Sequence, residues 1–203
     1  MLINNNLNLK RLHNELLNNN FVIVDDFLKD HVCSYLCKRM QKETNFEEYF
    51  DDYQSINYTT QDSVTKSLSE EIISKCNLEK FKRAWSFIYN TKAKGTTLHT
   101  DPGADITMSV WVTPNNCVIN LDKNGFKLSN IPYIMDTNDK SDEKKIKDFI
   151  KKEKVTFINI PYKYNRAIFF KSKLLHETNG VNTLEGIHNK RVSYTMLFTD
   201  NNV

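Results

Sequence analysis

A chain of 203 residues, 39% hydrophobic and 26% charged, is long enough for one globular domain with a substantial core. With only 5 glycines and 4 prolines, it is neither collagen-like nor disordered by composition. The 28 basic and 25 acidic side chains leave a net charge of +3. Bulk charge therefore does not indicate a nucleic-acid-binding protein, although a local basic patch stays possible.

The sequence gives no sign of a membrane span, a secretory signal or a disulfide framework. It has no run of 18 apolar residues. Residues 1–10 are asparagine-rich and lack a basic flank followed by an apolar core. The spacing of Cys33, Cys37, Cys76 and Cys117 fits neither a zinc cluster nor paired cysteines. We therefore expect free thiols, a reducing compartment and a cytoplasmic protein.

The first part of the chain reads mainly as helix. Apolar periodicity predicts helices over Asn8–Asn18, Phe27–Glu43 and Asp62–Cys76, and a short buried strand over Phe21–Val24. Residues 45–60 are aromatic and acidic without a clear period. We predict that they are irregular and border a functional site as a loop.

From residue 81 the pattern changes to short strands separated by turn-forming breaks. The predicted strands are Phe81–Asn90, Ile106–Thr113, Cys117–Leu121, Gly125–Leu128, Val155–Ile160, Arg166–Phe170 and Arg191–Phe198. Asp139–Lys154, rich in lysine, is predicted to be an exposed helix with a solvated charged face. Helices followed by strands indicate an α+β fold, with the strands in a sandwich or barrel. We expect one domain over 1–203, mainly helical in 1–80 and β in 81–200.

One stretch, Leu98–Gly103, carries the first chemical signal. His99 and Asp101 stand two positions apart just before a predicted strand. In an extended chain such residues point to the same side, so an imidazole and a carboxylate could reach one point. With a second histidine they would form a 2-His-1-carboxylate triad for iron(II). Alone, the pair is more typical of a turn with a surface histidine.

The candidate second histidine is His176, which follows a predicted strand and precedes a polar turn. The chain has 5 histidines. His13 and His31 fall in predicted N-terminal helices, where we expect exposure. His188 lies in a turn immediately before the last strand, which restricts its reach. These positions favour His176.

A candidate anion anchor opens the last predicted strand at Arg191. An unpaired buried charge is costly, and a guanidinium grips a carboxylate through two parallel hydrogen bonds. Ser193 lies on the same side of the strand, and Tyr89, ten residues before His99, could place a phenol near the same anion. A salt bridge to a protein acid for Arg191, and simple core packing for Tyr89, are the structural alternatives.

Together, these residues resemble the 2-oxoglutarate/Fe(II)-dependent dioxygenase superfamily, and Tyr89 resembles its prolyl-4-hydroxylase-like branch in particular. A closer likeness, to an uncharacterised subgroup, rests on four motifs: Trp111–Pro114, Asn165–Ala167, His176–Thr178 and Lys190–Arg191. Residues 21–28 also resemble the first strand of the superfamily. Where those relatives commonly carry Gly-Gly, this chain has Asn124 and Gly125, which puts the local turn in question.

The resemblance implies a double-stranded β-helix (a cupin-like jelly roll) with N-terminal supporting helices. It implies that His99, Asp101 and His176 bind Fe(II), and that Arg191 binds 2-oxoglutarate with support from Ser193 and Tyr89. The catalytic residues are then His99, Asp101, His176 and Arg191. O2 would be the further co-substrate. The implied reaction hydroxylates an unidentified protein residue or small molecule and releases succinate and CO2.

Three alternatives stay open at the level of sequence. The first is a nucleic-acid-directed oxidative demethylase of the same superfamily, although no pattern of stacking aromatics accompanies the lysines. The second is a catalytically inactive jelly-roll binding module. The third is a zinc hydrolase using the same three ligands, which would not need Arg191. We expect neither nucleic acid nor membrane as a partner, and the sequence does not predict an oligomeric state.

Overall fold

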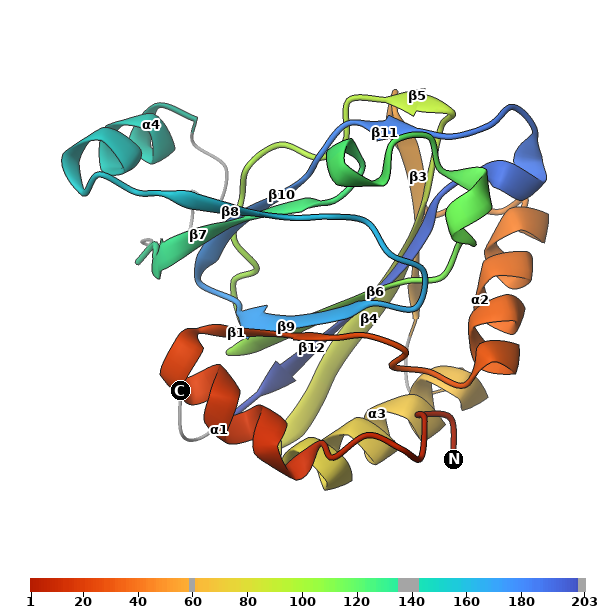
Figure 1. The fold of residues 1–203 in the computed structure, drawn as a ribbon, viewed down its shortest axis with the longest axis horizontal. Coiled ribbons are helices and arrows are strands. Elements are labelled where there is room, and N and C mark those ends of the chain that lie inside the picture. The colour runs from red at the N-terminus through yellow and green to blue at the C-terminus, as the bar shows by residue number, and fades with distance from the viewer. Residues whose placement is uncertain (59–60, 135–142, 201–203) are drawn as a thin grey trace.

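A computed structural model of the protein describes residues 1–58, 61–134 and 143–200 and shows a fold of mixed helices and antiparallel strands (Figure 1). The helices are α1 (Lys10–Asn19), α2 (Asp30–Lys42), α3 (Ser63–Cys76) and α4 (Glu143–Lys152). The strands are β1 (Phe21–Val24), β2 (Glu48–Tyr49), β3 (Tyr53–Tyr58), β4 (Lys80–Tyr89), β5 (Lys92–Ala93), β6 (Ile106–Trp111), β7 (Phe126–Pro132), β8 (Phe157–Ile160), β9 (Ala167–Lys171), β10 (Leu174–Thr178), β11 (Val181–Asn182) and β12 (Val192–Thr199).

The strands form one large sheet and two small ones. The large sheet has the order β1-β9-β6-β12-β4-β3-β2, and the smaller sheets have the orders β10-β7-β8 and β11-β5. Each pairing between these strands is antiparallel. The β10-β7-β8 sheet lies across from the large one, while α1, α2 and α3 lie on the large sheet's outer side (Figure 1). The helices thus leave the inner face of the large sheet to the functional site.

The two faces of the large sheet follow the two-residue alternation of its strands. On β12, Val192, Tyr194 and Met196 belong to the apolar core shared with the helices, whereas Ser193 and Thr195 line an inner cavity. Hydroxyl side chains on the inner face therefore stand back to back with apolar side chains on the outer face.

Helix ends on the outer side follow their local sequence. The Asp62 carboxylate caps α3 by accepting a hydrogen bond of 2.8 Å from the backbone N–H of Thr65. The helices α1 and α3 are followed by Asn20 and Asn77, both in the left-handed conformation with φ of 66° and 56°. Asparagine tolerates this conformation better than most residues, which explains where these two helices stop.

Several predicted elements are confirmed. The strand over Phe21–Val24 has the predicted bounds, and the ends of the first and third helices lie within two residues of the predicted ones. The second helix begins at Asp30 instead of Phe27, because the backbone N–H groups of Phe27 and Leu28 bond to Asn165. The last helix is present as α4, and residues 139–142 of its predicted range lie outside the described residues.

Other predictions are wrong. Residues 45–58 are not irregular throughout, because β2 and β3 within this range extend the large sheet beside β4. Residues 117–121 form no strand; Cys117 and Leu121 belong to the 3-10 turns Asn115–Cys117 and Leu121–Lys123, and residues 118–120 connect these turns. The strands β10, β5 and β11 were not predicted. His13 is buried instead of exposed, and its Nε2 lies 2.5 Å from the Asp200 carboxylate.

Two further observations concern the whole described chain. All four cysteines are free, as predicted. Within residues 1–58, 61–134 and 143–200, no helix combines the length and hydrophobicity needed to cross a bilayer.

Candidate metal centre

A pair of backbone hydrogen bonds brings His99 and His176 together, although they are far apart in the sequence. The N–H of His99 donates to the carbonyl of His176 at 3.0 Å, and the N–H of His176 donates to the carbonyl of His99 at 2.8 Å. The loop before β6 is thereby joined to β10. The N–H of Asp101 continues this join by donating to the carbonyl of Ser172 at 3.0 Å.

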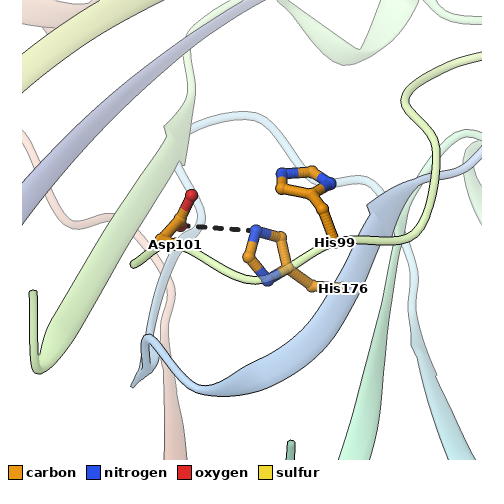
Figure 2. A group of neighbouring side chains, drawn as sticks. All are labelled: His99, Asp101 and His176. Carbon is orange, nitrogen blue, oxygen red and sulfur yellow. Dashed lines mark ion pairs between the residues drawn. The ribbon is translucent and has the colours of Figure 1, made fainter. Parts of the chain in front are cut away.

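The side chains of His99, Asp101 and His176 converge on one point (Figure 2). Their candidate ligand atoms all lie within 4.8 Å of one another. The Nε2 of His176 lies 3.3 Å from a carboxylate oxygen of Asp101. Asp101 and His176 are buried and His99 is partly exposed. Two imidazoles and one carboxylate at such separations form a donor set for a divalent transition metal, with one side open to the outside.

Backbone carbonyls fix which nitrogen of each histidine is available. The Nδ1 of His99 lies 2.6 Å from the carbonyl oxygen of Thr97, and the Nδ1 of His176 lies 2.9 Å from that of Leu174. Because a carbonyl can only accept, each Nδ1 carries the proton and donates. Each Nε2 then faces the cluster and can bind a metal when it carries no proton, whereas in the metal-free protein the Nε2–H of protonated His176 can donate to Asp101.

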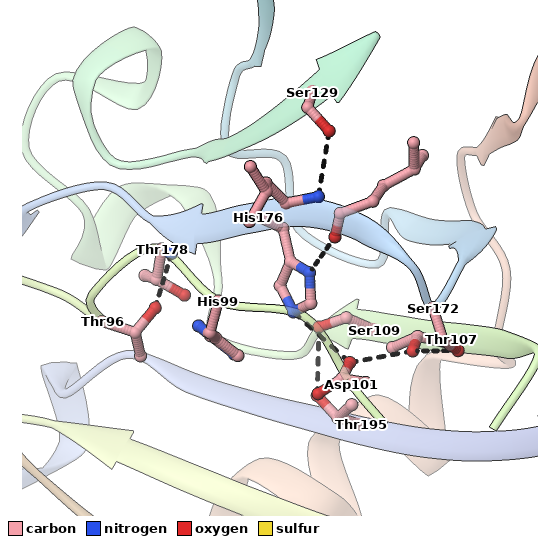
Figure 3. A network of polar contacts seen from close by, with 12 residues as sticks. Thr96, His99, Asp101, Thr107, Ser109, Ser129, Ser172, His176, Thr178 and Thr195 are labelled. Atoms are coloured by element: carbon pink, nitrogen blue, oxygen red, sulfur yellow. Dashed lines mark hydrogen bonds and ion pairs between the residues drawn. The ribbon is translucent and has the colours of Figure 1, made fainter. Parts of the chain in front are cut away.

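The Asp101 carboxylate is ionised and held by hydroxyl groups. Thr107 donates to it at 2.8 Å, and the Thr107 hydroxyl lies 2.9 Å from that of Ser172 (Figure 3). Burial alone would raise the pKa of Asp101. The attraction and hydrogen bond of His176, with smaller effects of His99 and Thr107, outweigh burial and lower the pKa to about 2.

The triad forms part of the wall of a small inner cavity of about 60 Å³ between the two facing sheets. Its wall combines hydroxyl and aromatic side chains. The lining residues are Trp85, Phe87, Tyr89, Thr96, His99, Asp101, Thr107, Ser109, Phe126, Phe170, His176, Thr178, Ser193 and Thr195. A cavity of this kind shields a bound group from bulk water and still offers it several hydrogen-bonding hydroxyls.

Arg191 is fully buried beside this cavity. Its guanidinium carbon lies 5.3 Å from the ring centre of Tyr89 and 5.1 Å from those of Trp111 and Tyr162. One Nη donates to the carbonyl of Asn124 at 2.7 Å, while the buried Nε has no hydrogen-bond partner. Burial lowers the pKa of Arg191, an effect that Tyr89 and Tyr162 partly offset. Within the described residues, no carboxylate pairs with this guanidinium, so the protein-acid alternative is not supported.

Tyr89 and Ser193 form a polar corner of the inner cavity together with Thr178. The Tyr89 hydroxyl lies 3.2 Å from that of Thr178, and Ser193 is also a hydrogen-bonding neighbour of Tyr89. The guanidinium of Arg191 lies behind the Tyr89 ring and is not among the residues lining the cavity. Thus two of the three predicted anchor residues face the cavity, and the third supplies positive charge from behind them.

The turn at Asn124 and Gly125 differs from the Gly-Gly pattern but is well packed. A Cβ at Gly125 would lie 1.9 Å from the carbonyl oxygen of Ile160, so this position requires glycine. The buried Asn124 side chain donates to the carbonyls of Ile119 and Asn120 and accepts from the N–H of Asn182. These bonds fix the backbone carbonyl of Asn124 that receives Arg191.

A second, larger depression of about 370 Å³, here called the outer cleft, lies on the exposed side of the triad. It shares His99 and Asp101 with the inner cavity. Its other lining residues are Glu48, Phe50, Tyr53, Asn57, Arg83, Trp85, Phe87, Thr96, Thr97, Thr100 and Pro102. The outer cleft therefore gives a molecule from solvent access to two of the three candidate ligands, His99 and Asp101.

The sequence did not single out Thr107 or Tyr162, and it placed Trp111 and Thr178 in motifs without assigning them a contact at the site. Thr107 supports Asp101, Thr178 joins Tyr89, and Trp111 and Tyr162 enclose Arg191. The signal available for Thr107 was its hydroxyl on an otherwise apolar strand, at a position that points inward with Ser109. Nothing local to Tyr162 indicates its role, because it comes from a loop between β8 and β9.

Comparison with known proteins gives a uniform result for the fold. No family model and no curated protein sequence matches the chain. Among solved structures, the chain is similar to the α-ketoglutarate-dependent epimerase SnoN of nogalamycin biosynthesis, at 13% identity and a TM-score of 0.71, covering 95% of this chain and 83% of that one. A Trichoplax adhaerens prolyl hydroxylase in complex with a hypoxia-inducible factor peptide gives 16% identity, a TM-score of 0.65 and coverage of 95% and 89%.

A third similar structure is HygX from Streptomyces hygroscopicus, solved with nickel and 2-oxoglutarate bound. It gives 8% identity, a TM-score of 0.63 and coverage of 95% of this chain and 87% of that chain. At such identities the likeness establishes the fold. The chain has the fold of the 2-oxoglutarate- and Fe(II)-dependent oxygenases, prolyl hydroxylases among them, so the resemblance inferred from the sequence is confirmed at the level of fold.

Proposed function

We propose that this protein is an Fe(II)- and 2-oxoglutarate-dependent dioxygenase that hydroxylates a protein residue or a small molecule and releases succinate and CO2. One observation carries the proposal. A His99–Asp101–His176 donor set lies in the same cavity wall as Tyr89 and Ser193, and a buried arginine without a carboxylate partner lies directly behind them. A candidate metal site and a candidate anion site thus lie side by side in an oxygenase fold.

Iron(II) would be held by the Nε2 atoms of His99 and His176 and by the Asp101 carboxylate. The carbonyls of Thr97 and Leu174 orient both rings for this role. Three protein ligands leave further coordination positions for other molecules. A zinc hydrolase could use the same ligands, but it gives no reason for a buried guanidinium beside them.

The distal carboxylate of 2-oxoglutarate would be held at the polar corner by the hydroxyls of Tyr89 and Ser193. The positive charge of Arg191 would compensate the negative charge of this carboxylate. The full burial of Arg191 without a carboxylate partner among the described residues supports this role, since its charge is otherwise uncompensated. The aromatic rings around the guanidinium exclude water and strengthen its attraction for an anion.

We also propose that the two facing sheets are a double-stranded β-helix and that residues 1–203 form one domain. The antiparallel order of the large sheet and the β10-β7-β8 sheet opposite it support this architecture. The helices α1 to α3 pack on the outer face of the large sheet and stiffen the strands that carry the site.

When bound, iron and 2-oxoglutarate together supply the oxidising power that turns a substrate C–H bond into C–OH with O2. The chain's own residues position and protect this chemistry. Asp101 stays ionised, the two histidines keep a fixed tautomer, and Phe126 and Phe170 close the cavity around His176.

The test is anaerobic titration of the protein with Fe(II) and then 2-oxoglutarate, followed by absorption spectroscopy. A visible band that needs both components is expected for the wild type. Asp101→Ala should lose it through loss of iron. Arg191→Met, which keeps the volume within the aromatic cage, should bind iron normally but need a much higher 2-oxoglutarate concentration.

Succinate formation in air, with and without candidate substrates, separates an enzyme from an inactive binding module. A protein that binds iron and 2-oxoglutarate but never forms succinate would be such a module. If Arg191→Met left 2-oxoglutarate affinity unchanged while circular dichroism showed a native fold, the anchor assignment would be wrong.

A further inference from the structure

The outer cleft has a composition that restricts what can bind in it. Its floor is made by residues of β3 and β4 that share one face of the large sheet, because Tyr53 pairs with Tyr89 and Asn57 with Trp85. The same cleft reaches His99 and Asp101. A molecule lying on this floor is therefore beside the candidate metal centre.

The floor is a continuous set of aromatic rings. Phe50 and Tyr53 are stacked with centroids 4.5 Å apart and an interplanar angle of 26°. Phe87 makes edge contacts with Tyr53 at 5.5 Å and with Trp85 at 6.1 Å. Phe50 is 46% exposed. Large apolar side chains that cluster at a surface usually indicate a binding site. These rings line the cleft that opens to solvent.

The charged side chains around this floor are mainly acidic, and Arg83 is the one basic residue among those lining the cleft. Residues 43–58, which include β2 and β3, contain five acidic side chains and no lysine or arginine. Glu48 belongs to the wall of the cleft, and Glu47 accepts a hydrogen bond of 2.6 Å from the wall residue Asn57. This acidic edge repels phosphates, so a nucleic acid strand would approach it at a cost.

A protein side chain already shows what the aromatic floor accepts. The guanidinium carbon of Arg83 lies over the Trp85 ring, 4.9 Å from its centre. This is a cation–π contact in an exposed setting, and rings faced in this way attract ammonium and guanidinium groups from ligands as well. The face of Trp85 is therefore suited to positive charge.

We propose that the outer cleft binds an organic cation, an ammonium or guanidinium group carried by an apolar or ring-bearing body, as the substrate of the site. Glu48 balances the charge, and the rings of Phe50, Tyr53 and Phe87 receive the apolar body. That the bound cation is a substrate rests on the proposed oxygenase function, whereas its binding to the cleft does not. The cation can come from a free small molecule or from a basic side chain of a peptide.

The test uses two probes that share an indole ring and differ in charge: tryptamine, a cation, and indole-3-acetate, an anion. Each is titrated by calorimetry into the purified protein, and again after loading with Ni(II) and 2-oxoglutarate. We expect tryptamine to bind at least about tenfold more tightly than indole-3-acetate. Equal affinities, tighter binding of the anion, or no saturable binding of tryptamine would overturn the proposal.

Two matched substitutions locate the effect. Glu48→Gln keeps an acceptor for Ser55, which donates to Glu48 at 2.6 Å, but removes the charge. It should reduce the preference for tryptamine to about threefold or less. Glu153→Gln removes an exposed carboxylate that follows α4, pairs with Lys152 and does not line the cleft, and it should leave the preference unchanged. An unchanged preference in Glu48→Gln would refute the role of the acidic wall.

Three further ligands distinguish the sources of the cation. Acetylated, amidated Gly-Lys-Gly and Gly-Arg-Gly represent a peptide substrate, and a short oligothymidylate represents a polyanion. Tighter binding of a peptide or of tryptamine supports the proposal and identifies the source. Tighter binding of the oligonucleotide refutes it. Because binding is measured without turnover, a failure of succinate formation tests the oxygenase function separately.

Discussion

The two faces of the large sheet differ in what they contribute, although the same strands make both. The outer face of β12 places Val192, Tyr194 and Met196 against the helices, and the inner face places Ser193 and Thr195 in the cavity beside the metal ligands. The outer face supplies most of the apolar burial, and the inner face supplies hydroxyls. Along β12, residues that pack in the apolar core thus alternate with residues that line the cavity. Substitutions can therefore test stability and metal binding separately.

The largest expected effect is on the inner side. His176→Ala should lower affinity for Ni(II) or Fe(II) by more than about 100-fold. Loss of a metal ligand costs more affinity than loss of a residue that hydrogen-bonds to a ligand, which typically costs about 10- to 100-fold. Calorimetric titration measures this effect. His188→Ala is the control, because His188 is exposed and lies in a turn away from the triad. Equal losses in both variants would contradict the assignment of the site.

Next comes a substitution on the outer face. Met196→Ala should lower the free energy of unfolding by about 2–5 kcal/mol, since Met196 is fully buried in the core shared with the helices. Urea unfolding measures the loss. Metal affinity of the folded variant should match that of the wild type. A large fall in metal affinity would show that the two faces are not independent.

A smaller effect is expected on the inner side. It distinguishes a hydroxyl that hydrogen-bonds to a candidate metal ligand from a hydroxyl that only lines the cavity. Thr107→Val removes the hydroxyl that donates to Asp101 and should weaken metal binding by about tenfold. Thr195→Val removes an inner-face hydroxyl whose partner is Ser109, 3.3 Å away, and should not weaken metal binding. A similar loss in both variants would point to general polarity of the cavity and not to the bond with Asp101.

The smallest effect concerns Asp62, which caps α3 on the outer side and pairs with Arg39 at 2.7 Å. Burial raises the pKa of Asp62, but the bonds from Thr65 and Arg39 outweigh it and lower the pKa. Ionised Asp62 therefore contributes fully to the free energy of unfolding above the ordinary carboxyl pKa of about 4. This contribution is lost as the pH falls through the lowered pKa of the folded state.

Asp62→Asn keeps a capping acceptor and removes the charge. It should lower stability near neutral pH by less than about 1 kcal/mol and flatten the loss of stability in acid. Urea unfolding at several pH values measures both effects. An identical acid dependence in the two proteins would mean that other carboxylates dominate it.

The sequence predicts much of the framework because its local signals agree with the tertiary structure. The run Phe21–Val24 is apolar, short and bounded by asparagine and aspartate, and it forms the predicted strand. His99 and Asp101 are two positions apart, and the backbone places them in one cluster with His176. Their role as iron ligands stays a prediction, as do the roles of Arg191, Ser193 and Tyr89.

The missed features depend on contacts between distant segments. Residues 53–58 lack a clean apolar alternation because one side faces the outer cleft, yet pairing with β4 makes them a strand. Val118 and Ile119 have strand-forming side chains, but only Val118 finds a bridge partner, Thr183. Polar character around His176 suggested a turn, whereas β7 holds this segment as β10. Pairing overrides propensity in each case.

The reciprocal backbone bonds between His99 and His176 also relate metal uptake to folding. The two residues are 77 positions apart, so their approach closes a long loop that the unfolded chain opens. A metal ion that needs both imidazoles binds the native state and not the denatured ensemble. Each tenfold excess of metal over its dissociation constant then adds about 1.4 kcal/mol to the unfolding free energy. Thermal denaturation in graded metal concentrations can therefore rank candidate ions before any substrate is known.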